Sequence, residues 1–428
     1  MTVGARIAVI GGGYVGLPTA GVLAQFGHTV VCAERDEARF RALAEGRVPI
    51  VEDGLADLIA EVVAKGTLRF VRRAADAVRG AEFVFLCVAT PEGDGGAADV
   101  TFVEDVATEI AGALDPGAIV VNKSTVPVGT AAAVERITGV TAVSNPEFLR
   151  EGTAVRDSLH PDRVVVGADD LRAAQRVGEL FSETGAPLIV TDKITAETIK
   201  YASNAFLATK LSFVNALAGL CESVGADIRD VVLGLGYDRR IGFDFLRPGP
   251  GWGGSCLPKD AAALVRIAED AGYDFTLLRA AIDVNDESRE RVVRKVVDAA
   301  GGRLSGRTVG VWGLAFKAGT DDRRMSPAVA IARRLVELGA TVRAYDPTVP
   351  TGPGTVDLEG MVLCADPYDA SRGAHAVALL TEWDELRDLD FSKVADLMAS
   401  PTLVDARNLL DPDALRRAGF SYAGVGRS

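Results

Sequence analysis

One cysteine lies behind a run of glycines, and its neighbours have the types that covalent catalysis through sulfur needs. Four glycines fall within residues 249–254, just before Cys256, so the backbone there can approach a bound molecule closely. Pro258 suits the first turn of a helix, which places Cys256 near a helix N-terminus, where a thiolate is stabilised. Lys259 and Asp260 follow on the same side of that helix. These residues predict a nucleophile, although a buried cysteine in a tight turn also fits them.

A second pair of polar residues interrupts a long apolar helix that we expect over residues 195–220. Its Ala, Leu and Phe residues run nearly all the way round, so the helix is either buried or at a subunit interface. Lys200 and Asn204 are four residues apart in it. A buried lysine is costly unless it is paired or used, whereas a lysine at the rim would extend to the surface.

Two carboxylates, Glu147 and Glu151, have the same four-residue spacing. If residues 146–152 are helical, both carboxylates share one face. That face either supplies a base close to the reacting atoms or is a solvated acidic surface, and the sequence favours neither reading over the other.

The elements that must position these residues begin with a dinucleotide-binding fingerprint. A buried strand over residues 6–10 runs into a Gly-x-Gly-x-x-Gly loop at residues 11–16, a helix over residues 17–26 and a second strand that ends at Glu34. The glycines make the turn, admit the pyrophosphate and let the helix pack on the strand, while an acid after the second strand accepts hydrogen bonds from the ribose hydroxyls. Glu34 favours NAD over NADP, and Arg35 beside it weakens that preference slightly.

Three more apolar strands are expected, each followed by a polar loop that contains proline. The strands cover residues 83–88, 118–122 and 141–144. In an open parallel sheet, such loops line the ligand crevice at the carboxyl ends of the strands. Proline alone can merely end a strand, but three such loops in this context favour contact with a cofactor.

A second series of strands and helices begins after Gly301-Gly302. Strands are expected over residues 308–314, 341–345, 376–380 and 402–405, which is typical of a second Rossmann-like domain without the glycine fingerprint. In place of the fingerprint stands a loop in which Lys317 and Arg324 have the charge to clamp phosphates, or simply a solvated loop. We therefore expect an α/β protein with an N-terminal domain at 1–194, a helical middle domain at 195–300 and a C-terminal domain at 301–428.

Composition excludes several classes of function. The formal net charge of -13 over 428 residues argues against a nucleic-acid partner. The 5 cysteines are scattered and there are only 3 histidines, so we expect neither a disulfide framework nor a metal site. Reduced thiols, together with the lack of a signal-peptide pattern and of a membrane-spanning apolar run, predict a cytoplasmic protein without a membrane partner.

Taken together, the motifs resemble the UDP-glucose/GDP-mannose dehydrogenase family, whose pattern they follow in order from residue 11 to about residue 408. The matching motifs are Gly11-x-Gly13-Tyr14-Val15-Gly16, Thr90-Pro91, the run 124–130, the run 145–152, Lys200-x-x-x-Asn204, the run 253–260 and the loop 316–327.

The resemblance implies a four-electron oxidation of the C6 alcohol of a nucleotide-sugar, UDP-glucose by the closest match, to the glucuronate with two NAD and water. Cys256 would capture the aldehyde as a thiohemiacetal, which becomes a thioester that water hydrolyses. Lys200 and Asn204 would stabilise oxyanions at C6. Asp260 and Thr125 would orient water, and Glu147 would be the base.

The resemblance also implies binding residues, which match by position. The cofactor set is Gly11, Gly13, Tyr14, Val15, Gly16, Glu34, Arg39, Thr90, Thr125, Glu151, Lys259 and Arg324. The substrate set is Phe148, Leu149, Arg150, Glu151, Lys200, Asn204, Arg240, Phe245, Leu246, Arg247, Gly253, Phe316, Lys317 and Arg407. Arg240 matches an arginine that reaches in from a partner subunit, which implies a homodimer.

Some positions depart from the family pattern, and some alternatives stay open. Glu34 stands where aspartate is more usual, Trp252 and Leu257 replace aromatic residues beside the cysteine, and Asp53 replaces a common proline. A dTDP-glucose substrate differs from UDP-glucose by one methyl group, which is worth only about 1–3 kcal/mol of discrimination. The resemblance makes GDP-mannose and UDP-N-acetylmannosamine less favoured substrates. A non-catalytic protein that binds NAD and a nucleotide-sugar, and a dehydrogenase that stops at the aldehyde, are the other readings.

Overall fold

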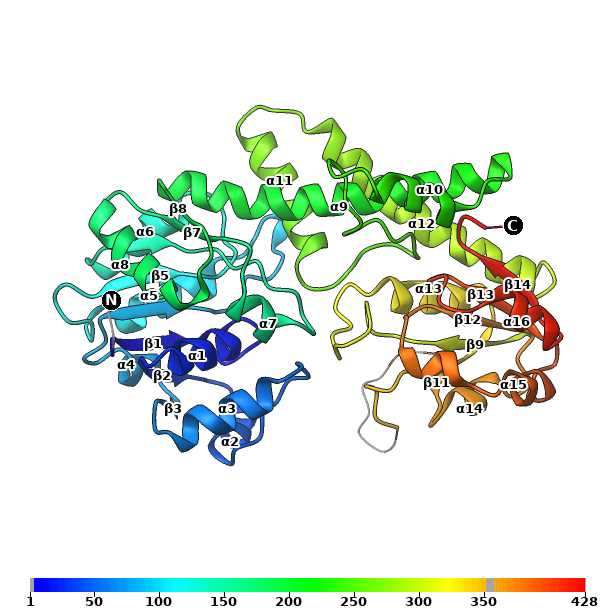
Figure 1. The fold of residues 1–428 in the computed structure, drawn as a ribbon, viewed down its shortest axis with the longest axis horizontal. Helices are drawn as coiled ribbons and strands as arrows, with labels where there is room; N and C mark the ends of the chain where they lie inside the picture. Colours follow the sequence, from blue (N-terminus) through cyan, green and yellow to red (C-terminus); the bar gives the residue numbers. More distant parts are fainter. Residues whose placement is uncertain (1–3, 352–357, 359, 428) are drawn as a thin grey trace. The chain divides into compact units, whose positions relative to one another are not determined.

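The computed structural model describes residues 4–351, 358 and 360–427, which fall into two compact units (Figure 1). The first unit runs to Ser203 and also takes in Ala262–Tyr273. The second unit holds Asn204–Ala261 and the chain from Asp274 onward.

The first unit is built on a sheet with the strand order β3-β2-β1-β4-β5-β6-β7-β8. The first six strands are parallel in the order of a dinucleotide-binding sheet, as the fingerprint predicts. The last two strands differ from the expected parallel sheet, because β7 pairs with β6 in the antiparallel direction. The strands are β1 (Arg6–Ile10), β2 (Thr29–Ala33), β3 (Leu68–Val71), β4 (Phe83–Leu86), β5 (Ile119–Asn122), β6 (Ala142–Ser144), β7 (Val164–Gly167) and β8 (Leu188–Thr191).

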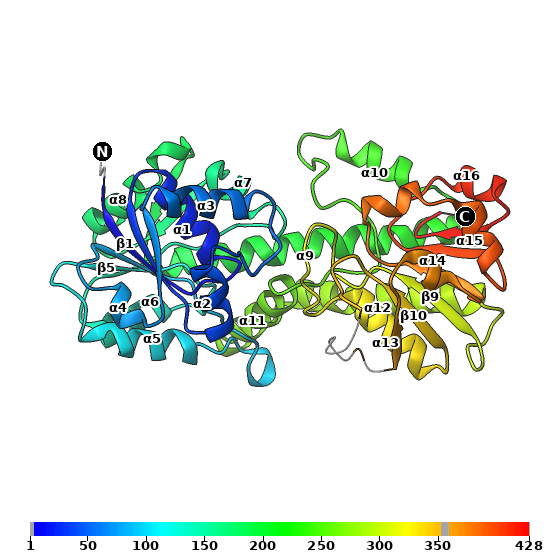
Figure 2. The same cartoon turned by 90° about the horizontal axis from the view of Figure 1, so that it is seen from below.

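Helices cover both faces of this sheet (Figure 2). One core cluster joins α1, α3 and α8 to the sheet, and a second joins α4, α5 and α6 to the opposite face. Strand β4 is buried along its whole length, which is why it reads as a continuous apolar run. The helices are α1 (Gly16–Gln25), α2 (Glu37–Ala44), α3 (Leu55–Ala64), α4 (Ala74–Ala77), α5 (Thr101–Ala111), α6 (Thr130–Thr138), α7 (Ala154–Leu159) and α8 (Leu171–Glu179), with short 3-10 turns at Asp94–Gly96 and Ser182–Thr184.

The second unit holds a six-stranded parallel sheet with the order β11-β10-β9-β12-β13-β14, which repeats the order of the first six strands of the other sheet. Its elements are β9 (Thr308–Trp312), α13 (Pro327–Glu337), β10 (Thr341–Tyr345), β11 (Met361–Leu363), α14 (Pro367–Ser371), β12 (Ala376–Leu379), α15 (Phe391–Leu397), β13 (Thr402–Asp405), α16 (Pro412–Arg417) and β14 (Ser421–Gly424), with a 3-10 turn at Asp384–Asp388. The second Rossmann-like fold is therefore confirmed.

Four helices lie between the two sheets in sequence: α9 (Lys193–Val224), α10 (Ile228–Gly236), α11 (Leu257–Asp270) and α12 (Thr276–Ala299). Helix α9 is longer at both ends than the expected 195–220. Among the described residues it is also the one helix that has the length and apolar composition of a membrane span, and 44% of its most apolar window is buried. Lys200 and Lys210 interrupt this helix, so it contains no uninterrupted apolar run of the length that a membrane span needs. It contains buried Lys200 and Asn204, which is typical of the core helix of a folded protein rather than of a lipid-facing one.

Candidate active site

The fingerprint loop of the first unit has the shape of a pyrophosphate cradle. Gly11 has a φ of +107°, and a Cβ on Gly16 would lie 1.7 Å from the carbonyl oxygen of Gly11, so a larger residue cannot occupy either position. A Cβ on Gly13 would meet nothing within 4 Å, which leaves that backbone open to a ligand. Helix α1 begins at Gly16 and has no acidic residue in its first turn. The loop and helix N-terminus therefore fit the phosphates of a dinucleotide.

Glu34, at the end of β2, is buried and held in place by the backbone. Its carboxylate accepts hydrogen bonds from the N–H groups of Gly12 at 3.0 Å and Asp36 at 2.8 Å. A carboxylate has about four acceptor sites, so two remain for ribose hydroxyls. The guanidinium of Arg35 lies over the ring of Phe102, 4.7 Å from its centroid, and is thereby engaged with α5. Arg39 is exposed on α2, and its backbone N–H donates to the carboxylate of Asp36, which caps the helix.

The strand-end loops of the first unit meet as expected. The hydroxyl of Thr90, after β4, donates a 2.8 Å hydrogen bond to the carbonyl of Thr125, after β5. Ser124, Thr125 and Pro146 line a small recess together with Ser144, Val126, Glu197 and Lys200. The three loops therefore converge on one edge of the sheet, where Rossmann folds bind their ligands.

Lys200 and Glu147 form an ion pair inside this edge. The ammonium Nζ donates to Glu147 Oε1 at 2.8 Å, and both side chains are about 95% buried, with exposures of 4% and 5%. Burial opposes ionisation of Glu147, but the charge and hydrogen bond of Lys200, the N–H of Leu149 and the charge of Lys123 outweigh it and lower the pKa of Glu147. The snorkelling alternative for Lys200 is therefore wrong.

The segment that follows Glu147 is a loop rather than a helix. Residues 145–150 have no regular structure, Glu151 lies in a turn, and helix α7 begins only at Ala154. Glu147 and Glu151 were expected to share a face only if residues 146–152 were helical, and that condition is not met. Pro146 and Gly152 flank the segment, and its polar groups bond to residues outside it.

Side chains around this loop fix its shape. The Glu147 carboxylate accepts from the N–H of Leu149 at 2.6 Å. Arg150 pairs with Asp157, with 2.6 Å between Nη2 and Oδ1. The ring of Phe148 lies under the guanidinium of Arg163, 3.6 Å from the ring centroid.

Sequence reasoning missed two buried glutamates that hold the loops of the first unit. Glu52 accepts from the N–H groups of Gly152 at 2.8 Å and Ala154 at 2.6 Å, at the start of α7. Glu197 accepts from the N–H groups at 129 and 131, at 2.6 and 2.9 Å, at the start of α6. The residues around them carry no signal for this role, because the N–H groups that they accept from lie far along the chain.

In the second unit, Cys256 immediately precedes α11. Its carbonyl accepts the N–H of Asp260 at 2.9 Å, so the cysteine occupies the cap position that the sequence predicts. The other four cysteines are buried, whereas Cys256 is partly exposed. The Sγ lies 3.6 Å from the hydroxyl of Ser255.

Asp260 is completely buried and contacts two other predicted site residues. Its carboxylate accepts from Asn204 Nδ2 at 2.5 Å and from Lys259 Nζ at 2.6 Å. Asn204 lies on α9 and Lys259 on α11, so Asp260 holds these two helices together within the second unit. Lys259, which the resemblance assigns to the cofactor, is therefore paired with Asp260 in the first turn of the helix that follows Cys256.

The glycines before Cys256 pack against the β9–α13 loop. A Cβ on Gly253 would lie 2.2 Å from the carbonyl oxygen of Met325, and one on Gly254 would lie 2.9 Å from the ring of Phe316. Lys317 lies over that same ring, with Nζ 5.6 Å from the centroid. Arg324 pairs with Asp322 at 2.7 Å. The predicted substrate residues of this loop therefore lie beside the cysteine segment.

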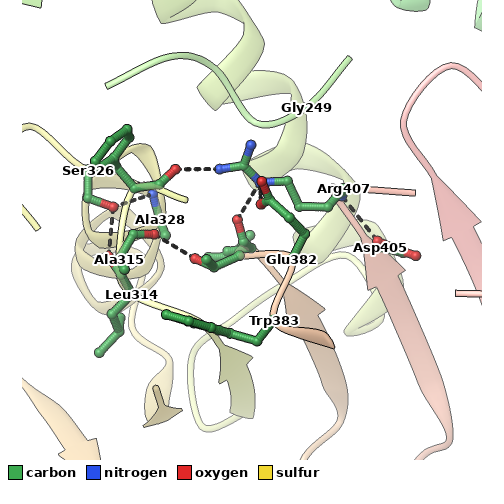
Figure 3. A network of polar contacts seen from close by, with 12 residues as sticks. Gly249, Leu314, Ala315, Ser326, Ala328, Glu382, Trp383, Asp405 and Arg407 are labelled. Atoms are coloured by element: carbon green, nitrogen blue, oxygen red, sulfur yellow. Dashed lines mark hydrogen bonds and ion pairs between the residues drawn. The ribbon is translucent and has the colours of Figure 1, made fainter. Parts of the chain in front are cut away.

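Arg407 follows β13, and its guanidinium reaches the loops that follow β9 and β12, the two strands between which the strand order reverses. Figure 3 shows the polar contacts around it. Its guanidinium donates to the carbonyl of Phe316 at 2.7 Å and of Leu380 at 2.8 Å, and it pairs with Glu382 at 3.0 Å. This is the position at which open α/β sheets bind ligands.

The second sheet lacks a dinucleotide cradle for a visible reason. Asp346, after β10, accepts from the N–H groups of Leu314 at 2.7 Å and Ala315 at 2.9 Å. Ser326 caps α13 with its own hydroxyl, which also donates to the carbonyl of Leu314. The backbone donors of this loop and of the first turn of α13 are therefore already satisfied within the protein.

Four further predicted residues lie in the segment between α10 and α11. Leu246 is buried, Phe245 has a positive φ of 59°, and Arg247 is exposed. Arg240 is 88% exposed at its side chain and pairs with Asp238 at 2.6 Å.

The chain combines a dinucleotide cradle that has an acid for the ribose with a partly exposed cysteine at a helix N-terminus. These features are those of an NAD-dependent dehydrogenase. Three family models match the chain: the NAD binding domain of the UDP-glucose/GDP-mannose dehydrogenase family at residues 5–184, its central domain at 194–287 and its UDP binding domain at 310–412. The chain belongs to this family.

Individual relatives agree with the family models. The chain is 46% identical over 435 residues to a UDP-glucose 6-dehydrogenase of Rhizobium meliloti (strain 1021), with 99% of each chain covered. It resembles the structure of a UDP-glucose dehydrogenase from Pyrobaculum islandicum, with a TM-score of 0.90 and 35% identity over 99% of this chain and 98% of the other. A UDP-D-ManNAc dehydrogenase structure from Pyrococcus horikoshii matches at a TM-score of 0.88 and 27% identity, with 99% of each covered.

Proposed function

We propose that the protein oxidises the C6 alcohol of UDP-glucose to the carboxylate of UDP-glucuronate in two steps. The observation that supports the proposal most strongly is Cys256, partly exposed at the N-cap of α11 beside the Asn204–Asp260–Lys259 network. A two-electron oxidation needs no such cysteine. The relatives named for UDP-glucose are more similar to this chain than the relative named for an N-acetylated sugar, which favours glucose.

The proposed reaction has two covalent intermediates, and both form on the sulfur of Cys256. The alcohol loses a proton and a hydride, and the Cys256 thiolate adds to the resulting aldehyde to give a thiohemiacetal. Loss of a second hydride gives a thioester, and water then displaces the thiolate. One UDP-glucose, two NAD+ and one water become UDP-glucuronate, two NADH and three protons. Bound NAD supplies the hydride acceptor in each oxidation.

The polar residues have complementary roles in this proposal. Lys200 and Asn204 are four residues apart on α9 and donate hydrogen bonds to the oxygen on C6 as it becomes negative. Glu147, ionised through its pair with Lys200, takes a proton from the attacking water. Asp260 and Thr125 orient that water. Asp260 also orients the Asn204 amide by accepting one of its N–H groups, which leaves the other N–H for the substrate.

The binding residues divide between the units. The fingerprint loop with Glu34, Arg39, Thr90, Thr125 and Glu151 binds NAD, and Lys259 and Arg324 complete the cofactor set. The nucleotide-sugar is bound by Phe148 to Glu151, Phe245 to Arg247, Gly253, Phe316, Lys317 and Arg407. Functional segments at 1–194, 195–300 and 301–428 correspond to cofactor binding, nucleophile and UDP binding. The five free cysteines favour a cytoplasmic location.

The assembly we propose is a homodimer formed through α9. Phe206, Phe213, Leu220 and Val224 are all more than half exposed and recur at seven- and four-residue spacings, which places them along one face of the helix. Such a stripe of exposed large apolar residues is typical of a subunit interface. Arg240, exposed beside this region in sequence, would then serve the partner's nucleotide-sugar.

A steady-state panel tests the proposed substrate. Purified protein with NAD is offered UDP-glucose, dTDP-glucose, GDP-mannose and UDP-N-acetylmannosamine, and the products are identified by mass spectrometry. We expect the highest kcat/KM for UDP-glucose, with UDP-glucuronate as product. A higher kcat/KM for any other sugar nucleotide would reassign the substrate, and binding of NAD without turnover of any of them would leave only a binding protein.

A further inference from the structure

Lys123 is a buried lysine with an unusual environment in the first unit. It directly follows β5 and is only 8% exposed. Its Nζ donates one hydrogen bond, of 3.1 Å, to the amide oxygen of Asn145, and lies 5.4 Å from the centroid of the Phe181 ring. Within the described part of the chain, no carboxylate lies within ion-pair distance of it. Lys193, equally buried, pairs with both Glu135 and Asp169.

Such an arrangement is expensive for folding. An ammonium taken out of water without a carboxylate partner loses hydration that one neutral hydrogen bond does not replace. Burial lowers the pKa of Lys123, the charge of Glu147 opposes that shift, and the charge of Lys200 adds to it. A methionine of similar length would fill the same space at lower cost, so the charge itself needs an explanation.

The register of the sheet places Lys123 between the cofactor loop and the Glu147–Lys200 pair. Leu86, Asn122 and Ser144 are aligned on adjacent strands, so the residues that follow them, Cys87, Lys123 and Asn145, lie in a row beyond the strand ends. Asn145 also donates through Nδ2 to the carbonyl of residue 165 at 2.7 Å. The amide of Asn145 therefore connects Lys123 to β7 at the start of the turn that leads to Glu147.

We propose that Lys123 is a positioning residue for the oxidation proposed above: its ammonium holds the Asn145–Glu147 turn through Asn145 and provides a second positive charge beside Glu147. The proposal rests on the proposed function, because it takes Glu147 as the base. In that mechanism Lys200 has two tasks, pairing with Glu147 and stabilising an oxyanion on C6. When the ammonium of Lys200 turns to the oxyanion, Lys123 remains as the cation that keeps the buried Glu147 carboxylate ionised.

The titratable groups that surround Lys123 come from three segments packed around it. They are Cys87 after β4, Glu147 after β6 and Lys200 on α9. Burial raises the pKa of the Cys87 thiol to about 12, so this thiol is neutral near pH 7. Removing the charge of Lys123 therefore leaves Lys200 and the N–H of Leu149 as the groups that lower the pKa of Glu147, and that pKa rises.

The test compares Lys123→Met with a matched control, Lys193→Met, in the full-length enzyme. For Lys123→Met we expect an unchanged or higher Tm, a kcat at least tenfold lower, KM values for NAD and UDP-glucose within threefold of wild type, and an acid limb of the kcat profile moved up by about one pH unit. For Lys193→Met we expect a lower Tm, because two carboxylates lose their partner, with the acid limb unmoved. A lysine with only a structural role would instead lower the Tm and leave the acid limb in place.

A second variant covers the case in which Lys123→Met does not fold. Lys123→Gln removes the charge but keeps an N–H donor for Asn145, and we expect the same displaced acid limb. A wild-type acid limb in a folded neutral variant overturns the proposal. Failure of the proposed function is recognised separately, because it is read from the products of the wild-type enzyme alone, whereas the role of Lys123 is read from the ratio of variant to wild type.

Discussion

At the scale of single residues, the cysteine proposed as the nucleophile is the one that is not buried. Burial raises the pKa of the Cys87 thiol to about 12 and that of the Cys364 thiol to about 11, and it also raises the pKa of Cys32. These thiols stay protonated near neutral pH and do not act as nucleophiles. Cys256 alone combines partial exposure with the N-cap of a 14-residue helix.

The first prediction concerns that cysteine. Cys256→Ser should lower kcat for formation of UDP-glucuronate by at least about a thousandfold, because an alkoxide is harder to generate than a thiolate and an ester intermediate would hydrolyse slowly. The affinity for NAD, measured by calorimetry, should stay within about twofold, since the fingerprint loop is unaltered. Turnover within tenfold of wild type would remove Cys256 from the mechanism.

The second prediction concerns the choice of cofactor. Glu34→Gln has the same shape and keeps an acceptor for one of the two N–H groups, those of Gly12 and Asp36, but removes the charge that repels a 2′-phosphate. The preference for NAD over NADP, as a ratio of kcat/KM values, should fall by about tenfold or more. Arg35→Ala is the matched control: its guanidinium is stacked on Phe102, so the preference should hardly change. An unchanged preference in Glu34→Gln would mean that another group discriminates.

At the scale of elements, the sequence predicts strands and cap positions well and long-range side-chain partners poorly. Strands β1, β10 and β13 have the expected bounds, because each is a short apolar run between turn residues. The loop at 145–152 differs from its conditional helical reading, since its conformation depends on Glu52, about 100 residues earlier. Asp346 and Glu197 were missed for the same reason: their partners are backbone N–H groups that only the folded chain brings near.

The third prediction tests this kind of element-holding contact. Glu52→Ala leaves the N–H groups of Gly152 and Ala154 without their acceptor and should destabilise the protein by about 2–4 kcal/mol, visible as a thermal midpoint at least about 4 °C lower. Glu61→Ala, which removes an exposed ion pair with Lys65 on α3, should cost no more than about 0.5 kcal/mol. Equal midpoints for the two variants would contradict the assignment.

At the scale of the whole molecule, two sheets of the same strand order have different ligands. In the first, Gly13 is open and Glu34 leaves acceptor sites for a ribose. In the second, Asp346 and Ser326 satisfy the equivalent donors, and Arg407 stands at the edge instead. The sequence predicted both folds from strand patterning, and the missing glycines indicated that the second sheet would bind something else. The parallel β7–β8 pair joins β6 in the antiparallel direction, and no sequence signal distinguishes this addition from a continued parallel sheet.

The fourth prediction concerns assembly through the exposed face of α9. Phe206→Lys combined with Phe213→Lys places two charges on a face that we expect to be buried between subunits, so the mass measured by light scattering should fall from dimer to monomer. Leu171→Lys, at an equally exposed apolar position on α8, should leave the mass unchanged. A double variant that keeps the wild-type mass would place the interface elsewhere.

The central claim is that one sugar is oxidised twice in succession, and that Cys256 captures the aldehyde between the two oxidations. The most direct measurement supplies a limiting, known amount of UDP-glucose with excess NAD and counts the NADH formed at completion by absorbance, alongside the sugar product. The account predicts two NADH for each UDP-glucose consumed and no free aldehyde at any time. One NADH for each sugar, with the aldehyde accumulating as the end product, would contradict it.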